Sequence, residues 1–171
     1  MKKAQIRLTE TIAVLFIFFV LILFGILFYY QYQKIAIKEK QEEILASRAM
    51  ETTLKVLHLP ELICSKGQAE PEDNCFDVLK LNSAGEVFMD KGDSFDYYFD
   101  LFSYSKITVY QFYPYNQTWT LYDKEKPPLE DGTPGWTRRE PTYFVVNLRD
   151  ETKQEIDASY GFGYVKVEAY S

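Results

Sequence analysis

The longest run of the sequence without a charged residue extends from Thr11 to Gln33 and comprises 23 positions. As a helix with a rise of about 1.5 Å per residue it measures roughly 34 Å, enough to cross a hydrocarbon core of about 30 Å. Its side chains are apolar on every helical face, so the run predicts a membrane-spanning helix rather than an amphipathic one. The alternative is a buried core helix, but the domain that follows is too small to enclose one. Aromatic residues form a belt at the far end of the run, at Phe28, Tyr29, Tyr30 and Tyr32.

The charges beside this run do not decide its orientation, because three basic residues precede it and four follow it closely. Both cysteines, Cys64 and Cys75, follow the run, and a disulfide between them would close a loop of about a dozen residues and contribute about 3 kcal/mol. Two unpaired thiols are the alternative, and a zinc site would need ligands beyond these cysteines and His58. Asn116 begins an N-glycosylation acceptor pattern, Asn-Gln-Thr, which has meaning only on a translocated domain. Together these features favour an extracytoplasmic C-terminal region.

The residues ahead of the apolar run do not form a conventional secretory signal, which has an apolar region of about 7–15 residues followed by a small-residue cleavage site. Here the apolar run is longer, and the small residue Ala4 precedes it. The sequence passes from a basic pair through Ala4-Gln5-Ile6 and a polar stretch to Glu10 into a long apolar helix. This order resembles the class III signal peptide of type IV pilins and archaellins, especially archaeal ones.

The resemblance implies that a prepilin peptidase cuts on the cytoplasmic side of the membrane and leaves the apolar helix in the mature chain. The family cuts after Gly or Ala, which favours cleavage after Ala4. Its glutamate is usually the fifth mature residue, a position that Glu10 takes only if the cut follows Gln5. The mature chain is therefore expected to begin at Gln5 or at Ile6.

Glu10 stands at the start of the apolar run, where a charge costs free energy unless it is paired. When apolar helices bundle, the new α-amino group of one chain becomes buried, and Glu10 of an adjacent helix is expected to pair with it and fix the axial register. Arg7 is an additional partner for Glu10 within its own chain. The alternative is that Glu10 lies at the level of the lipid headgroups, where an acid costs little.

The helical pattern continues beyond the run as far as Pro60, since neither proline nor glycine occurs from Lys34 to Leu59. We expect one helix of roughly 75 Å from about Leu8 to Leu59, with Gly25 as a weak point where it bends or opens during assembly. The resemblance implies that the outer half packs on a globular head, and the heptads are too irregular to favour a coiled-coil stalk. The residues expected on its packed face are Ile37, Ile44, Leu45, Ala49, Thr52, Val56 and Leu59.

The sequence pattern of residues 60–171, which we call the head, predicts an antiparallel α+β domain. Two strands flanking Asn82–Gly85 suggest a hairpin, and Asp93 or Ser94 is expected to cap a short helix. The Pro- and Gly-containing stretch Asp123–Arg139 predicts a surface loop. The head is rich in aromatic residues, so exposed tyrosines are candidates for subunit contacts, with amphipathic aromatics on the sheet faces as the alternative. The expected strands are Phe76–Leu81, Glu86–Met89, Lys106–Tyr113, Thr118–Tyr122, Thr142–Leu148 and Tyr160–Tyr170.

The two parts of the chain differ in charge. Residues 1–59 carry 8 basic and 5 acidic side chains, a net charge of +3, whereas residues 60–171 carry 11 basic and 20 acidic side chains, a net charge of −9. An acidic head argues against binding nucleic acid, which requires clustered cations. A calcium site is the alternative to a solvated helix face for four acidic residues, although their order does not fit a calcium loop. These residues are Asp90, Asp93, Asp96 and Asp100.

Nothing else in the sequence indicates catalysis. The chain has one histidine, and it contains no nucleophile elbow, phosphate-binding glycine loop or cluster of metal ligands. The sequence therefore predicts that the protein is not an enzyme and needs no cofactor or metal.

These features combine into an α+β chain of four segments. They are a leader at 1–5, a transmembrane and filament-core helix at 6–33, a helical stalk at 34–59 and an extracellular head at 60–171. The predicted function is that of a major or minor pilin of a type IV pilus-like filament, which resides in the cell membrane before assembly. Its expected partners are further copies of itself, the membrane, a prepilin peptidase and the pilus assembly machinery. The alternative is an uncleaved, single-pass membrane-anchored binding or accessory protein.

Overall fold

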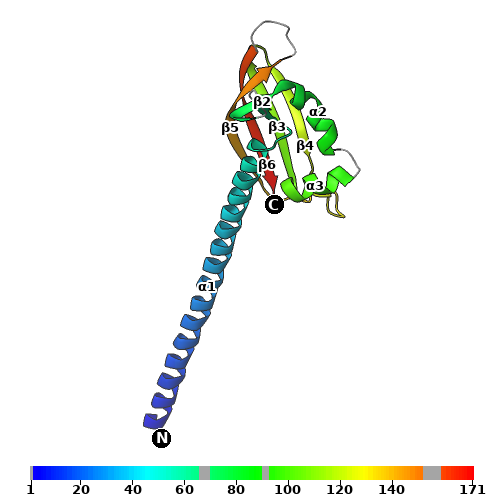
Figure 1. Ribbon diagram of the computed structural model, residues 1–171. Coiled ribbons are helices and arrows are strands. Elements are labelled where there is room, and N and C mark those ends of the chain that lie inside the picture. Colours follow the sequence, from blue (N-terminus) through cyan, green and yellow to red (C-terminus); the bar gives the residue numbers. More distant parts are fainter. Residues whose placement is uncertain (1, 66–69, 90–92, 152–158) are drawn as a thin grey trace. The chain divides into compact units, whose positions relative to one another are not determined.

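The computed structural model describes residues 2–65, 70–89, 93–151 and 159–171, with the side chains of residues 2–10 and 93–95 outside the description (Figure 1). The chain divides into two compact units. Unit 1 comprises Met1–Glu43, and unit 2 comprises Ile44–Ser171. The fold is α+β, with a long N-terminal helix followed by a six-stranded, mostly antiparallel sheet.

Helix α1 extends over Lys2–Leu57, as the unbroken helical pattern predicts. It ends in a turn ahead of Pro60, whose ring cannot continue a helix. Gly25 is the one glycine in the helix, and a Cβ atom placed there would meet nothing within 4 Å. By length and composition, α1 is apolar enough to cross a membrane.

The six strands of unit 2 form one sheet in the order β1-β2-β5-β6-β3-β4. All neighbouring strands are antiparallel except β2 and β5, which are parallel. The last four predicted strands are confirmed, and the predicted surface loop joins β4 to β5. The strands are β1 (Ile63–Ser65), β2 (Pro71–Asp77), β3 (Ser105–Tyr113), β4 (Gln117–Asp123), β5 (Arg139–Asp150) and β6 (Ser159–Tyr170).

The predicted hairpin around Asn82–Gly85 is wrong, because this segment lies within helix α2 (Val78–Met89). Its buried residues recur with a helical period, at Val78, Leu81, Ala84 and Phe88. The Asp77 carboxylate accepts a hydrogen bond of 2.9 Å from the Leu79 N–H at the start of α2. Asn82 and Gly85 are turn formers by composition, but both face β4 here. Asn82 accepts a hydrogen bond from Trp119, and a Cβ at Gly85 would lie 2.8 Å from the Thr120 carbonyl oxygen.

The predicted short helix is confirmed as α3 (Asp93–Phe102). Tyr98 and Phe102 are buried and pack against Phe88 of α2, with ring centroids 4.3 and 6.0 Å from that ring. Phe99 contacts Tyr104 edge-on at 5.2 Å. Aromatic contacts therefore hold α3 to α2 and to the start of β3.

The core of unit 2 lies on one face of the sheet. Alternate residues of the strands, among them Ile107, Leu121, Leu148 and Val165, pack there with side chains from α2, α3 and the end of α1. The prediction of a packed face on α1 is wrong for Ile37 and Ile44, because both side chains are more than half exposed. The sector predicted by the 100° periodicity was wide enough to include exposed positions together with buried ones. Its remaining members are buried, namely Leu45, Ala49, Thr52, Val56 and Leu59.

Candidate functional site

The apolar surface of α1 in unit 1 has no partner among the described residues of the protein. Phe16, Leu23 and Phe28 are 69%, 60% and 70% exposed, and none of the most apolar stretch of the helix is buried. An apolar surface of this extent on every side of one helix is stable only against lipid or against other apolar helices. Gln33, at the end of the uncharged run, donates a 2.8 Å hydrogen bond to the Tyr29 hydroxyl.

Beyond this run α1 carries a second exposed apolar strip, which we call the outer stripe. At 100° per residue its members fall on the side of the helix away from the buried Leu45, Ala49 and Val56. Met50 and Leu54 were not among the predicted residues, although their apolar character at helical spacing was a usable signal. The outer stripe consists of Ile44, Met50 and Leu54 of unit 2, which are 53%, 58% and 50% exposed.

The residues predicted to act in processing and register lie at the start of α1. The backbone at Ala4, Gln5, Arg7 and Glu10 is helical, and their side chains lie outside the described residues. Cleavage after Ala4 or Gln5 and the pairing of Glu10 with an α-amino group or with Arg7 therefore stay predictions. The bending or opening of the helix at Gly25 is also a prediction.

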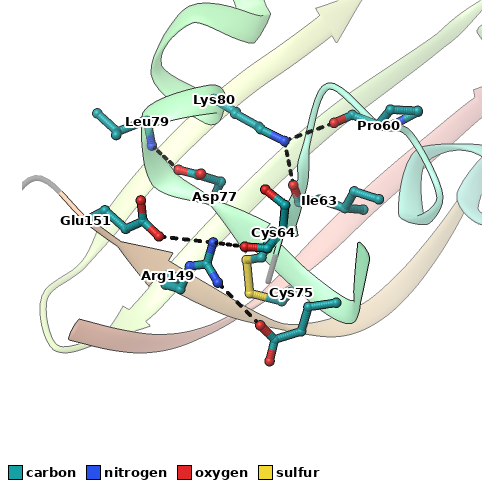
Figure 2. The surroundings of a disulfide bond; sticks show 11 residues. Pro60, Ile63, Cys64, Cys75, Asp77, Leu79, Lys80, Arg149 and Glu151 are labelled. Atoms are coloured by element: carbon teal, nitrogen blue, oxygen red, sulfur yellow. Dashed lines mark hydrogen bonds and ion pairs between the residues drawn. A yellow bond between two sulfur atoms is a disulfide. The ribbon is translucent and has the colours of Figure 1, made fainter. Parts of the chain in front are cut away.

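The predicted disulfide between Cys64 and Cys75 is present and joins β1 to β2, with 5.3 Å between the two Cα atoms (Figure 2). Both cysteines are buried. Arg149 of β5 lies beside them and donates a 2.8 Å hydrogen bond to the Ser65 carbonyl oxygen. The same guanidinium forms ion pairs with Glu72 at 3.5 Å and Glu151 at 3.0 Å. The disulfide and the Arg149 contacts thus link three neighbouring strands, including the parallel pair.

Lys80 of α2 connects this region to the segment that follows α1. Its Nζ donates hydrogen bonds of 3.0 Å to the Pro60 carbonyl oxygen and 2.7 Å to the Ile63 carbonyl oxygen (Figure 2). Both carbonyl oxygens thereby accept a hydrogen bond from a cation, which makes these bonds stronger than neutral ones. The contact fixes where the chain enters the sheet after the helix.

Asn116 lies in the turn between β3 and β4, and both Asn116 and Thr118 are exposed. Their accessibility fits the acceptor pattern, and glycosylation itself stays a prediction. For the acidic series, Asp96 and Asp100 are exposed on α3, whereas Asp90 and the side chain of Asp93 lie outside the described residues. Among the described residues no group of three or more His, Cys, Asp or Glu side chains is placed to hold a metal ion.

Burial and ion pairs shift the pKa values of several titratable groups in the sheet. Burial raises the pKa of Tyr122 to about 12, and its hydroxyl donates a 3.0 Å hydrogen bond to the Ser103 carbonyl oxygen. The hydrogen bond to Asp123 raises the pKa of Lys106, and the hydrogen bond to Glu168 raises the pKa of Lys166. These groups lie on strands rather than in a pocket, so their shifts reflect packing and pairing within the sheet.

Comparison of the chain with protein-family models, with curated proteins and with solved structures found no match. The architecture itself, a long apolar N-terminal helix followed by a β-sheet head, fits a pilin-like or a membrane-anchored protein. The candidate functional surfaces are therefore the exposed apolar faces, of which α1 carries the largest.

Proposed function

We propose that this protein is the subunit of an extracellular type IV pilus-like filament, assembled by bundling of its apolar N-terminal helices. The outer stripe is the observation that carries the proposal. Leu54 comes 21 residues after Gln33 along α1, and at about 1.5 Å per residue a bilayer centred on the uncharged run does not reach it. Apolar side chains in that position are expected to pack on helices of neighbouring copies.

An uncleaved membrane anchor accounts for the uncharged run but leaves the outer stripe without a partner. In the filament proposal the run packs first in the membrane and then in the filament, and the outer stripe packs on neighbouring copies. The head forms the outside of the filament, which suits its net charge of −9 because charge keeps exposed surfaces soluble. No catalytic role is proposed.

Replacement of Ile44 and Leu54 by Gln tests the role of the outer stripe. Both side chains are at least half exposed, so the double variant is expected to fold and insert normally and to yield at least tenfold fewer filaments. Leu129→Gln is the matched control, because Leu129 is 60% exposed in the loop between β4 and β5, and its filament yield should stay normal. Filaments are sheared from cells that carry the assembly machinery and quantified against total subunit. Normal yield from the double variant would refute the bundling role of the stripe.

Replacement of Glu10 by Gln tests the pairing with a neighbouring α-amino group. The change keeps the shape of the side chain and removes its charge, so the protein should be made, inserted and trimmed normally. An unpaired amine in a dry helix bundle costs about 3–5 kcal/mol, so the variant should enter filaments poorly. A normal filament yield would place Glu10 at the level of the lipid headgroups instead.

A further inference from the structure

The face of the sheet opposite the core carries a group of apolar side chains, most of them exposed, which we call the aromatic patch. Tyr164 of β6 lies at its centre. Its ring stacks on Tyr110 of β3 with centroids 4.8 Å apart, and it lies 5.3 Å from Phe112 and 5.8 Å from Tyr143. In the strand register Tyr164 also lies opposite Val145 of β5. The aromatic patch comprises Phe112, Tyr143, Val145, Tyr160, Phe162 and Tyr164.

The aromatic patch is open to solvent. Val165 and Val167 of β6 point to the other face and are fully buried, whereas Tyr160 and Phe162, earlier on the same strand and on this face, are 55% and 48% exposed. Phe112 and Tyr143 are 54% and 58% exposed, and Val145 is 57% exposed. At about half of the roughly 200 Å² that an aromatic side chain presents, these residues expose about 500 Å² of surface. That is near the upper limit for the largest apolar patch on a monomeric protein, and such patches are commonly interaction sites.

Two acidic side chains on this face are paired with three basic ones, although the head as a whole carries a net charge of −9. Lys106 pairs with Asp123, and Glu168 receives both Lys166 at 3.0 Å and Arg139 at 3.3 Å. Two acidic heads repel each other least where their acidic groups are already neutralised. The ammonium group of Lys166 lies 6.0 Å from the centre of the Tyr143 ring, so it also covers one edge of the patch.

We propose that the aromatic patch is an interface between the heads of two copies of this chain, packed face to face across a two-fold axis. Two patches of about 500 Å² bury about 1,000 Å², which meets the minimum for a specific but weak interface. Tyr and Phe are enriched at the centres of such interfaces, and ion pairs occupy their rims. An interface of this area is weak, and anchoring of the chains in one membrane raises their effective concentration further. The proposal does not rest on filament formation, because an anchored chain presents the same face.

Sedimentation of the full chain in detergent, over a range of concentrations, measures association of the heads while detergent shields the apolar helix. The wild-type chain should show a reversible monomer–dimer equilibrium. Tyr143→Lys and Phe162→Lys should each weaken it at least tenfold, and Val145→Thr, which keeps the β-branched shape, should weaken it several-fold. Tyr97→Lys is the matched control, since Tyr97 is 56% exposed on α3 outside the patch, and it should leave the equilibrium unchanged. Unchanged disulfide content and thermal midpoint verify that each variant is folded.

The proposal is overturned if the wild-type chain stays monomeric, or if the patch variants and the Tyr97 control associate equally well. Retention of the monomeric chain on a polysaccharide matrix, lost in Tyr143→Lys, would assign the patch to carbohydrate and overturn the proposal as well. The outer-stripe variant with Ile44 and Leu54 replaced should keep the wild-type dimerisation constant. Failure of the filament proposal and failure of this one are therefore distinguished.

Discussion

Leu23 in unit 1 and Leu121 in unit 2 are chemically identical, yet the first is 60% exposed and the second is fully buried. In unit 2 the apolar side chains of three helical segments and the sheet bury one another. In the described part of unit 1 they form the outside of one helix. The hydrophobic effect acts on both, but only unit 2 satisfies it within one chain. Unit 1 therefore depends on lipid or on other copies of the protein for its apolar surface.

Substitution of one glycine in each unit tests this difference between the two units most strongly. A Cβ atom at Gly163 of β6 would clash with the Tyr110 carbonyl oxygen, so Gly163→Ala should destabilise unit 2 by about 3 kcal/mol or more through overpacking. A Cβ atom at Gly25 meets nothing within 4 Å, so Gly25→Ala should leave the stability of unit 2 unchanged and favour the helix by about 0.5–1 kcal/mol.

Tryptophan fluorescence during urea unfolding measures this, because Trp119 and Trp136 are the two tryptophans of the chain and both lie in unit 2. Far-UV circular dichroism reports on α1 in the same samples. Equal fluorescence midpoints for Gly163→Ala and the wild type would show that the close approach of β6 to β3 is not a constraint.

Removal of the disulfide should have the next largest effect. Replacement of both Cys64 and Cys75 by Ala opens a loop of sequence separation 11, for which the chain-entropy model gives about 3 kcal/mol at most. The loss should appear in the fluorescence transition of unit 2 and not in the helical signal of the unit 1 part of α1, which remains after that transition. Free-thiol labelling of both cysteines in unreduced native protein would contradict the pairing, and equal loss of the α1 signal would contradict the independence of the units.

The smallest expected effect concerns Tyr122. Its pKa is raised to about 12 in the folded state, against about 10 in the unfolded chain, because burial disfavours the charged phenolate. Its contribution to stability is present below pH 10 and is lost as the pH rises towards 12, since only the unfolded state releases the proton in that window. Tyr122→Phe should lose the hydrogen bond to Ser103, at about 1 kcal/mol, and reduce the alkaline decline.

Midpoints of urea unfolding for the wild type and for Tyr122→Phe, measured at several pH values between 9 and 12, check this alkaline decline in stability. The remainder of the decline is expected from Tyr170, whose pKa burial also raises to about 12, and from Tyr98, Lys106 and Lys166, whose pKa values are raised as well. An alkaline decline of the same size in the Tyr122→Phe variant and the wild type would contradict the assignment.

Much of the fold could be predicted from the sequence because local signals and tertiary packing agree there. The uncharged run and the absence of Pro and Gly from Lys34 to Leu59 predict α1, and alternation of β-branched and aromatic residues predicts β3 to β6. The hairpin prediction failed because Asn82 and Gly85, turn formers in isolation, are used in α2 for contacts with β4. The parallel pairing of β2 with β5 depends on residues more than 70 positions apart, which no local pattern indicates.

Only some of the candidate surfaces could be predicted from the sequence. The disulfide could be predicted because two cysteines allow one pairing, and the exposure of the uncharged run follows from its composition. The outer stripe could not be separated from the packed face by periodicity, because Ile44 and Leu45 are adjacent in sequence and only the packing of unit 2 decides which is buried. The aromatic patch required the register of β3, β5 and β6, which brings Tyr110, Tyr143 and Tyr164 together.

The central claim is that this chain is processed as a pilin and leaves the membrane as a filament subunit, and the mass of its mature N-terminus tests it most directly. Protein is taken from its native membrane and from sheared filaments, and the N-terminal peptide is measured by mass spectrometry. The account predicts a chain that begins at Gln5 or Ile6, with α1 otherwise intact. A chain that retains Met1 in the native membrane would contradict it and favour an uncleaved membrane anchor.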